Sequence, residues 1–95
     1  MKTTIAMLYY VDGTSEEVTP DNGKYFTLKE LQKFTDGYIQ SLSLPSGEFI
    51  ICNEEGNNLG LQVNEKATEI WFHAYPNADR ELVGNVLICP RKMMH

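Results

Sequence analysis

The stretch GLQVNEKATEIWFHAY, residues 60–75, decides how the second half of this chain folds. Its apolar residues follow the i, i+3, i+4, i+7, i+8 spacing of a helix that turns one face toward a core. Asn64 stands just before the pattern and suits an N-cap, because its side-chain oxygen can accept from a free N–H of the first turn. The stretch therefore predicts a helix over residues 65–75.

The start of this helix is also the best candidate for a ligand site. Free N–H groups at a helix start can hold an anionic or polar group, and Trp71 or Tyr75 could stack on a base or ring. Thr68 needs a reason to be there, because β-branched residues are disfavoured inside helices. Asn64, Thr68 and Trp71 are therefore the predicted ligand-binding residues, and simple helix capping is the alternative.

A first helix is predicted upstream, in the stretch TLKELQKFTDG at residues 27–37. Thr27 and Glu30 have the spacing of a capping box, and apolar residues follow at intervals of three. Gly37 suits the left-handed position that ends a helix. The predicted helix spans residues 28–35.

Five segments have the apolar patterns and flanking turn residues of strands. The first is apolar on both faces, which favours a central strand. Asp12-Gly13 predicts a tight hairpin after it, with positive φ at both turn positions. The second carries Glu16 and Glu17, as an exposed edge strand often does. The five expected strands cover residues 2–11, 14–19, 38–44, 48–53 and 83–89.

These elements predict one α+β domain over residues 1–95, in the order ββαββαβ. We expect a mixed sheet of about five strands, with the two helices on one face. The segment NEEGNNLG, residues 53–60, is expected to be a polar loop, because Asn and Gly tolerate turn conformations.

Composition narrows the classes of partner. The net charge is −5 and the isoelectric point is near 4.9. An acidic chain is repelled by other anions, which disfavours binding to nucleic-acid backbones and to anionic membrane surfaces. No apolar run has the length of a membrane span. Cys52 and Cys89 are expected to be buried free thiols, and the chain is expected in the cytoplasm.

No cofactor, metal or catalytic motif is present. The spacing of His73, His95 and the two cysteines matches no zinc pattern. Glu54 and Glu55 are adjacent and would point in opposite directions on an extended backbone. We therefore predict no catalytic residue, metal or cofactor, and keep a small enzyme using Cys52 or the Glu54–Glu55 pair as an alternative.

Some aromatic residues lie outside the two helical stripes and could form an exposed interface patch. Isolated apolar residues are common on protein surfaces, so they carry no function by themselves. These residues are Tyr9, Tyr10, Tyr25, Phe26 and Phe72.

Four segments, TLKELQKFTDGYIQSL, IICNEEG, VNEKAT and LVGNVLI, resemble in order and spacing the domain-of-unknown-function family 3846. The resemblance covers nearly the whole chain. It implies a fold and an occurrence in bacteriophages, prophages and mobile elements, and it implies no established activity. Members usually carry an acidic residue soon after Gly-Tyr-Ile, where this chain has Gln40 and Ser41.

We therefore expect a small cytoplasmic binding module of phage or mobile-element type. It would act by stoichiometric binding and modulate host processes, including defence. The alternative is a nucleotide-binding sponge with its pocket at the start of the second helix, and a small enzyme is the third hypothesis. The partner is expected to be a protein or small molecule, with no nucleic acid or membrane, and a homodimer is left open.

Overall fold

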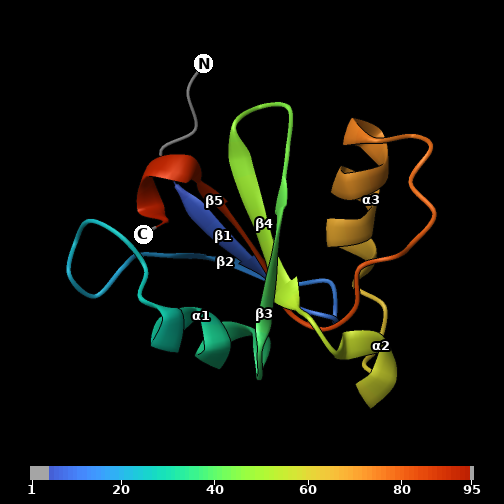
Figure 1. Cartoon of the computed structure of the whole chain (residues 1–95), viewed down its shortest axis with the longest axis horizontal. Helices are drawn as coiled ribbons and strands as arrows, with labels where there is room; N and C mark the ends of the chain where they lie inside the picture. The colour runs from blue at the N-terminus through green and yellow to red at the C-terminus, as the bar shows by residue number, and fades with distance from the viewer. Residues whose placement is uncertain (1–4, 95) are drawn as a thin grey trace.

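The computed structural model describes residues 5–94, and only the backbone of residues 57 and 58. The order ββαββαβ is confirmed, with one short extra helix in the loop expected over residues 53–60 (Figure 1). The elements are β1 (Ala6–Tyr9), β2 (Ser15–Val18), α1 (Leu28–Thr35), β3 (Ile39–Ser43), β4 (Glu48–Asn53), α2 (Gly56–Leu59), α3 (Glu65–Ala74), β5 (Val86–Pro90) and the 3-10 turn η1 (Arg91–Met93).

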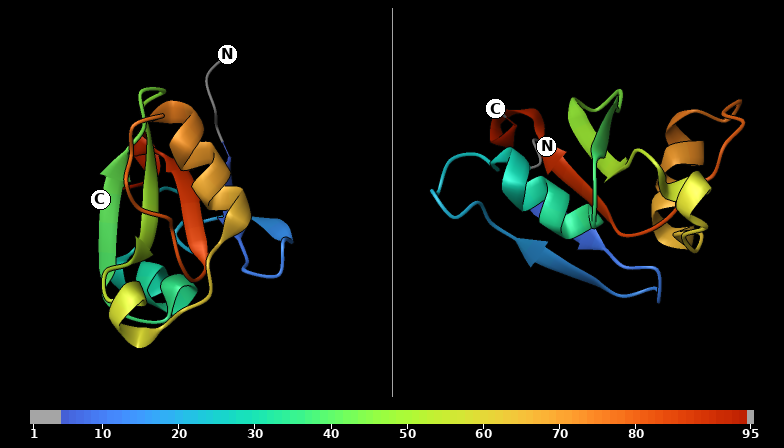
Figure 2. Two further views of the ribbon diagram at one scale, coloured as in Figure 1. Left: turned by 90° about the vertical axis from the view of Figure 1, so that its right-hand side faces the viewer. Right: turned by 60° about the horizontal axis from the view of Figure 1, so that its bottom comes forward.

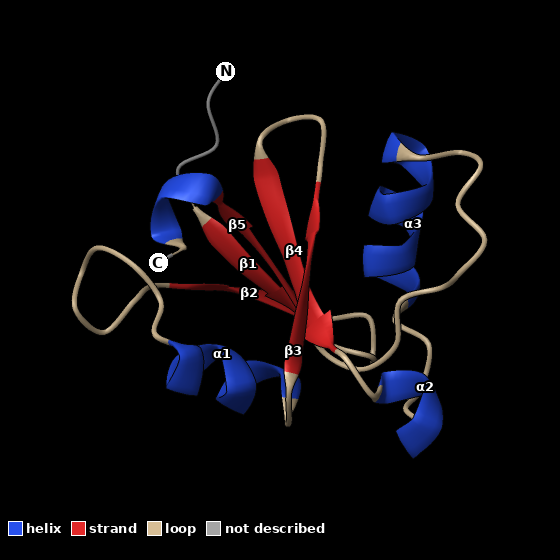
Figure 3. Ribbon diagram, in the orientation of Figure 1, coloured by secondary structure: helices blue, strands red, loops and turns tan. Residues whose placement is uncertain are grey.

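The α+β class and the five-stranded sheet are confirmed, and the strand order is β2-β1-β5-β4-β3 (Figure 3). All pairings in this described sheet are antiparallel, so the expectation of a mixed sheet was wrong in that detail. The strand buried along its full length is β5, while β1 lies next to the edge strand β2. Residues 2–4 of the first expected strand lie outside the described part of the chain.

The two long helices cover opposite faces of the sheet, whereas one shared face was expected (Figure 2). On β5, Leu87 belongs to a core cluster with Leu31 of α1. Its neighbour Ile88 belongs to a second cluster with Ala67 of α3. Side chains alternate between the faces of a strand, so a strand that is apolar at consecutive positions needs cover on both sides. The apolar run of β5 therefore requires this three-layer arrangement.

Helix α1 has the predicted bounds and the predicted capping box between Thr27 and Glu30. Its left-handed residue is Asp36, with φ 64°, and not Gly37. Glycine is still required at 37, because a Cβ there would lie 2.8 Å from Asn53 Nδ2. That amide is nearly fully buried and donates to the Thr35 carbonyl at 3.1 Å, so Asn53 holds the end of α1 against β4.

The turn between β1 and β2 has one positive φ, at Gly13 (91°), and not two as expected. Tyr10 N donates to Thr14 O at 2.9 Å, and Gly13 N donates to Tyr10 O at 3.1 Å. This is the three-residue hairpin loop in which a type I turn is followed by one left-handed residue. Asp12 instead stabilises the loop through its carboxylate, which accepts from Thr14 N at 2.9 Å.

Phe26 does not belong to an exposed patch, because only 1% of its surface is accessible. It lies one residue before the N-cap of α1 and shares the first core cluster with Leu31, as in a hydrophobic staple. Its ring meets Phe34 edge to face at 5.7 Å. The periodicity of α1 did not include Phe26, because the residue precedes the helix.

Candidate functional site

Asn64 caps α3 as predicted, and its side chain also bonds to the ends of two strands. Its Oδ1 accepts from Ala67 N at 3.1 Å. Its Nδ2 donates to the carbonyls of Tyr9 and Gly84, each at 2.9 Å. These two carbonyls lie at the same end of the paired strands β1 and β5, and Asn64 itself is fully buried. The side chain therefore fastens the start of α3 to the sheet.

Thr68 has a structural explanation that helix propensity did not supply. Its hydroxyl donates to Leu82 O at 3.2 Å and accepts from Leu82 N at 2.9 Å. Asn64 N also donates to Leu82 O, at 2.8 Å. Leu82 is fully buried, so Thr68 and Asn64 together hold the segment before β5 against α3.

The three predicted ligand residues therefore do not form one pocket. Asn64 and Thr68 are buried, and their donor groups bond to backbone carbonyls of the chain. Trp71 lies about two turns further along the helix, roughly 10 Å from Asn64 along the axis. The geometry favours the capping alternative at the helix start and separates Trp71 from it.

Trp71 instead lines an open hollow at the far end of α3, with a volume of about 420 Å³. We call it the α3 hollow. No lining side chain is charged, and the volume is in the range of small-ligand pockets. The α3 hollow is lined by Trp71, Ala74, Tyr75, Pro76, Asn77 and Ala78.

Two aromatic rings form the wall of the α3 hollow. The rings of Trp71 and Tyr75 are 4.7 Å apart and tilted by 55°. The Tyr75 hydroxyl donates to Ser43 O at 2.7 Å, which fixes the end of α3 to β3. The Trp71 Nε1 is buried and has no acceptor among the described residues. An aromatic wall held in place in this way can receive an apolar group without rearranging.

A small polar cluster lies on the same face of the sheet as α3. Arg80 Nη2 donates to Gln40 Oε1 at 3.1 Å, and Gln40 is paired across the sheet with Cys52. Burial raises the pKa of the Cys52 thiol, and the positive charge of Arg80 lowers it only in part. The cluster therefore holds a protonated thiol, which is a poor nucleophile.

The second thiol is protected in the same way on the opposite face. Both cysteines are buried and free, as predicted, and they belong to different core clusters. Burial raises the pKa of Cys89 from its ordinary 9.0 to about 12, and the charge of Glu48 adds to the effect. Neither thiol has the electropositive, accessible surroundings of a reactive cysteine.

We predict that a thiol reagent at pH 8 labels the native chain slowly and the unfolded chain rapidly. Because the folded pKa of Cys89 is raised, its contribution to stability is complete below the unfolded pKa of about 9. That contribution is lost as the pH rises toward 12. Cys89→Ala should flatten this alkaline loss in denaturant titrations. Fast thiol labelling of the native chain would contradict the assignment of Cys52 and Cys89 as buried, protonated thiols.

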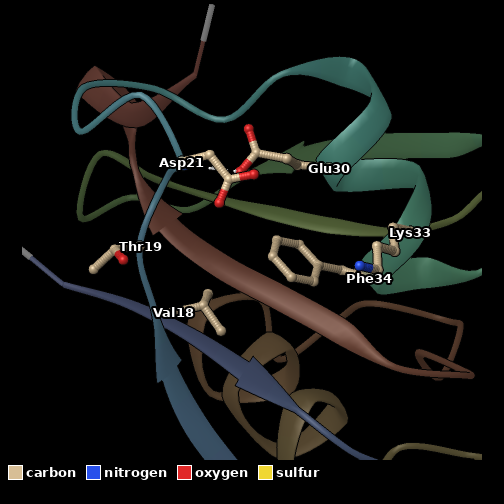
Figure 4. Close-up of a pocket in the computed structure, with 6 residues that line it drawn as sticks. All are labelled: Val18, Thr19, Asp21, Glu30, Lys33 and Phe34. Carbon is tan, nitrogen blue, oxygen red and sulfur yellow. Dashed lines mark hydrogen bonds between the residues drawn. The ribbon is translucent and has the colours of Figure 1, made fainter.

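A smaller pocket of about 240 Å³ lies between β2 and α1. In Figure 4 the side chains of Asp21 and Glu30 lie close together, and the Phe34 ring points into the space. Both Glu30 oxygens are used within the chain, by Asp21 N at 3.0 Å and by Thr27 N at 2.9 Å. These bonds lower the pKa of Glu30, the bond from Thr27 N contributing most. The Glu30 carboxylate in this pocket therefore serves as part of the capping box of α1.

The described residues give little support to a metal site, a pair of catalytic carboxylates or a membrane-spanning helix. Over residues 5–94 no three His, Cys, Asp or Glu side chains gather as they would around a metal ion. His73 is exposed, and His95 lies outside the described part. Glu54 and Glu55 are exposed and line neither pocket. No helix within the described range is long and apolar enough to span a membrane.

The comparison with protein families agrees with the pattern of motifs. Residues 4–93 match the family model described as "Domain of unknown function (DUF3846)". The chain belongs to this family. The match runs from just before β1 to the end of η1, so the family corresponds to the whole three-layer fold. No curated protein and no solved structure matched.

Sequence reasoning missed most of the α3 hollow. Pro76, Asn77 and Ala78 indicated only the end of a helix, although a Pro-Asn turn beside two aromatic residues was visible. Arg80 was not singled out, because its partner Gln40 is forty residues away. Only the Trp71 and Tyr75 stacking hypothesis pointed to this end of α3.

Proposed function

We propose that this protein is a stoichiometric binding module that receives an apolar side chain of a protein partner in the α3 hollow. The phage or mobile-element setting implied by the family resemblance, and a cytoplasmic site of action, belong to the proposal. The observation that carries it is the uncharged, aromatic lining of the hollow. Aromatic residues of this kind are enriched where protein interfaces concentrate their binding energy.

The lining favours a protein partner over a nucleotide. Phosphates are usually held by Lys, Arg or the free N–H groups of a helix start. The α3 hollow lies at the C-terminal end of α3, where the helix dipole is negative, and none of its lining residues is cationic. The nucleotide-sponge alternative therefore keeps Trp71 as a stacking surface but lacks a phosphate site there.

The enzyme alternative has weaker support. Cys52 is buried, and burial raises the pKa of its thiol. Glu54 and Glu55 are exposed and lie outside both described pockets, whereas paired carboxylates in acid–base catalysis work within a cleft. A binding role needs none of these groups.

Affinity capture from a host lysate tests the proposal with three baits. Ala78→Arg places a charged side chain in the α3 hollow, and Leu28→Arg places the same side chain on α1, across the sheet. Leu28 is 59% exposed, and Ala78 is half-buried in the turn that lines the open hollow, so both variants are expected to fold. We expect wild type and Leu28→Arg to retain the same partner and Ala78→Arg to lose it.

Two results would contradict the proposal. One is a partner retained equally by all three baits, which would place the binding surface elsewhere. The other is an absence of any stoichiometric partner together with a nucleotide that raises the melting temperature. A nucleotide at 100 times its Kd should add about 2.7 kcal/mol of stability, so such a rise would favour the sponge.

A further inference from the structure

The two edges of the sheet differ in what they offer to another strand. On β3, the bonds from Leu44 N to Glu48 O and from Glu54 N to Tyr38 O fix the alternation of the ladder. Antiparallel ladders use the backbone groups of every second residue. The N–H and C=O groups of the odd-numbered residues therefore point away from the sheet, at Ile39, Ser41 and Ser43.

The outer edge of β3 carries no charged side chain, and charge is one of the devices that usually block edge pairing. Residues 37–47 contain no charged side chain, although 22% of the chain is charged. The opposite edge strand, β2, carries Glu16 and Glu17. Charged residues on an edge discourage pairing with another chain. The contrast marks β3 as the edge that is free to pair.

We propose that β3 pairs with β3 of a second copy, so that the two sheets join into one antiparallel sheet across a two-fold axis at Ser41. This proposal goes beyond the binding function and does not depend on it. In this register Ser41 faces its own copy, and Ile39 faces Ser43 of the other copy. All three positions supply outward backbone groups, so each chain both donates and accepts.

The ends of β3 fit the same symmetry. Tyr38 precedes the strand and is 67% exposed, and Tyr75, 36% exposed, bonds to Ser43 at the other end. A two-fold axis at Ser41 brings Tyr38 of one copy next to Tyr75 of the other, twice. Exposed tyrosines that meet in reciprocal pairs favour a second copy of this chain over an unrelated strand.

One hydrogen bond already uses the edge and is compatible with the pairing. Ser43 O accepts from the Tyr75 hydroxyl at 2.7 Å, and a carbonyl oxygen has a second lone pair for an N–H of the partner copy. Because the axis is perpendicular to the sheet, both α3 hollows lie on the same side of the joined sheet. The dimer would present two binding surfaces together.

Opposite charges introduced at Ser41 in two separate variants test the register directly. The side chain of Ser41 is exposed, so Ser41→Lys and Ser41→Glu should leave the fold intact. Only in the proposed register does residue 41 meet itself. By light scattering after size exclusion, we expect wild type at twice 10.8 kDa, each variant alone at the monomer mass, and an equimolar mixture of the two restored to a 1:1 dimer.

Ser15→Lys is the matched control, because Ser15 is an exposed serine on the other edge strand. It should leave the dimer unchanged. A wild type that stays monomeric at high micromolar concentration would overturn the proposal. So would a dimer that persists in both Ser41 variants, or variants whose mixture stays monomeric. Tyr75 lines the α3 hollow and also belongs to the proposed dimer contact, but neither Ala78 nor Ser41 is shared. Ala78→Arg therefore tests the hollow and the Ser41 variants test the dimer.

Discussion

Replacing Asn64 by alanine should lower the free energy of unfolding by about 3–5 kcal/mol. Loss of an N-cap alone costs about 1 kcal/mol. Alanine would also leave the part-buried carbonyl of Tyr9 and the buried carbonyl of Gly84 without the Asn64 amide that bonds to them. A buried carbonyl left unsatisfied costs about 1–3 kcal/mol, and the part-buried Tyr9 carbonyl should cost about 1 kcal/mol, the lower end of that range. A loss larger than that of the cap alone would show that the Asn64 side chain also stabilises the fold by joining α3 to the strand ends at Tyr9 and Gly84.

Asn64→Ser separates the cap from the bridge. Serine keeps an oxygen for Ala67 N but cannot reach both carbonyls, so it should recover only about 1 kcal/mol of the alanine loss. Urea unfolding of the three proteins measures both differences. A total loss of about 1 kcal/mol for alanine would mean that the bonds to Tyr9 and Gly84 add nothing to stability.

Phe26→Ala should cost about 3–5 kcal/mol, the usual range for a buried phenylalanine. The ring is 1% exposed and packs against Phe34, while Phe26 N donates to Met93 O at 2.8 Å. Removing the side chain leaves a cavity where α1, β5 and η1 meet. A domain of this size has about 5–15 kcal/mol of stability, so the variant should melt much earlier.

Leu28→Ala is the control for this loss. Leu28 lies two residues away on α1 and is 59% exposed, so its truncation should change stability by no more than about 0.5 kcal/mol. Calorimetry of both variants gives the comparison. Equal losses would show that Phe26 is not a core residue of the folded chain.

The sequence could predict those features of the fold that depend on residues close together in the chain. The capping residues and helix periodicity placed α1 at its observed bounds and gave α3 its N-cap, because these signals are local. The bridge made by Asn64 could not be predicted in the same way, since its partners at Tyr9 and Gly84 are 55 and 20 residues away. The amide was visible, but the carbonyls it bonds to were not.

The layers and the candidate site show the same limit. The helices were expected on one face, although the apolar run of β5 already required cover on both. The predicted ligand residues were chosen as neighbours on one helix, whereas burial divides them. Asn64 and Thr68 are closed off by backbone partners, and Trp71 is open to the hollow only because the turn over residues 76–78 folds beside it.

Fluorine NMR of protein labelled with 5-fluorotryptophan gives the sharpest test of binding in the α3 hollow, because Trp71 is the single tryptophan in the chain. The spectrum should contain one resonance that reports the α3 hollow. We expect it to shift when the captured protein partner is added, and to stay in place with nucleotides. A resonance that does not move while the partner co-elutes with the protein would contradict the proposed function.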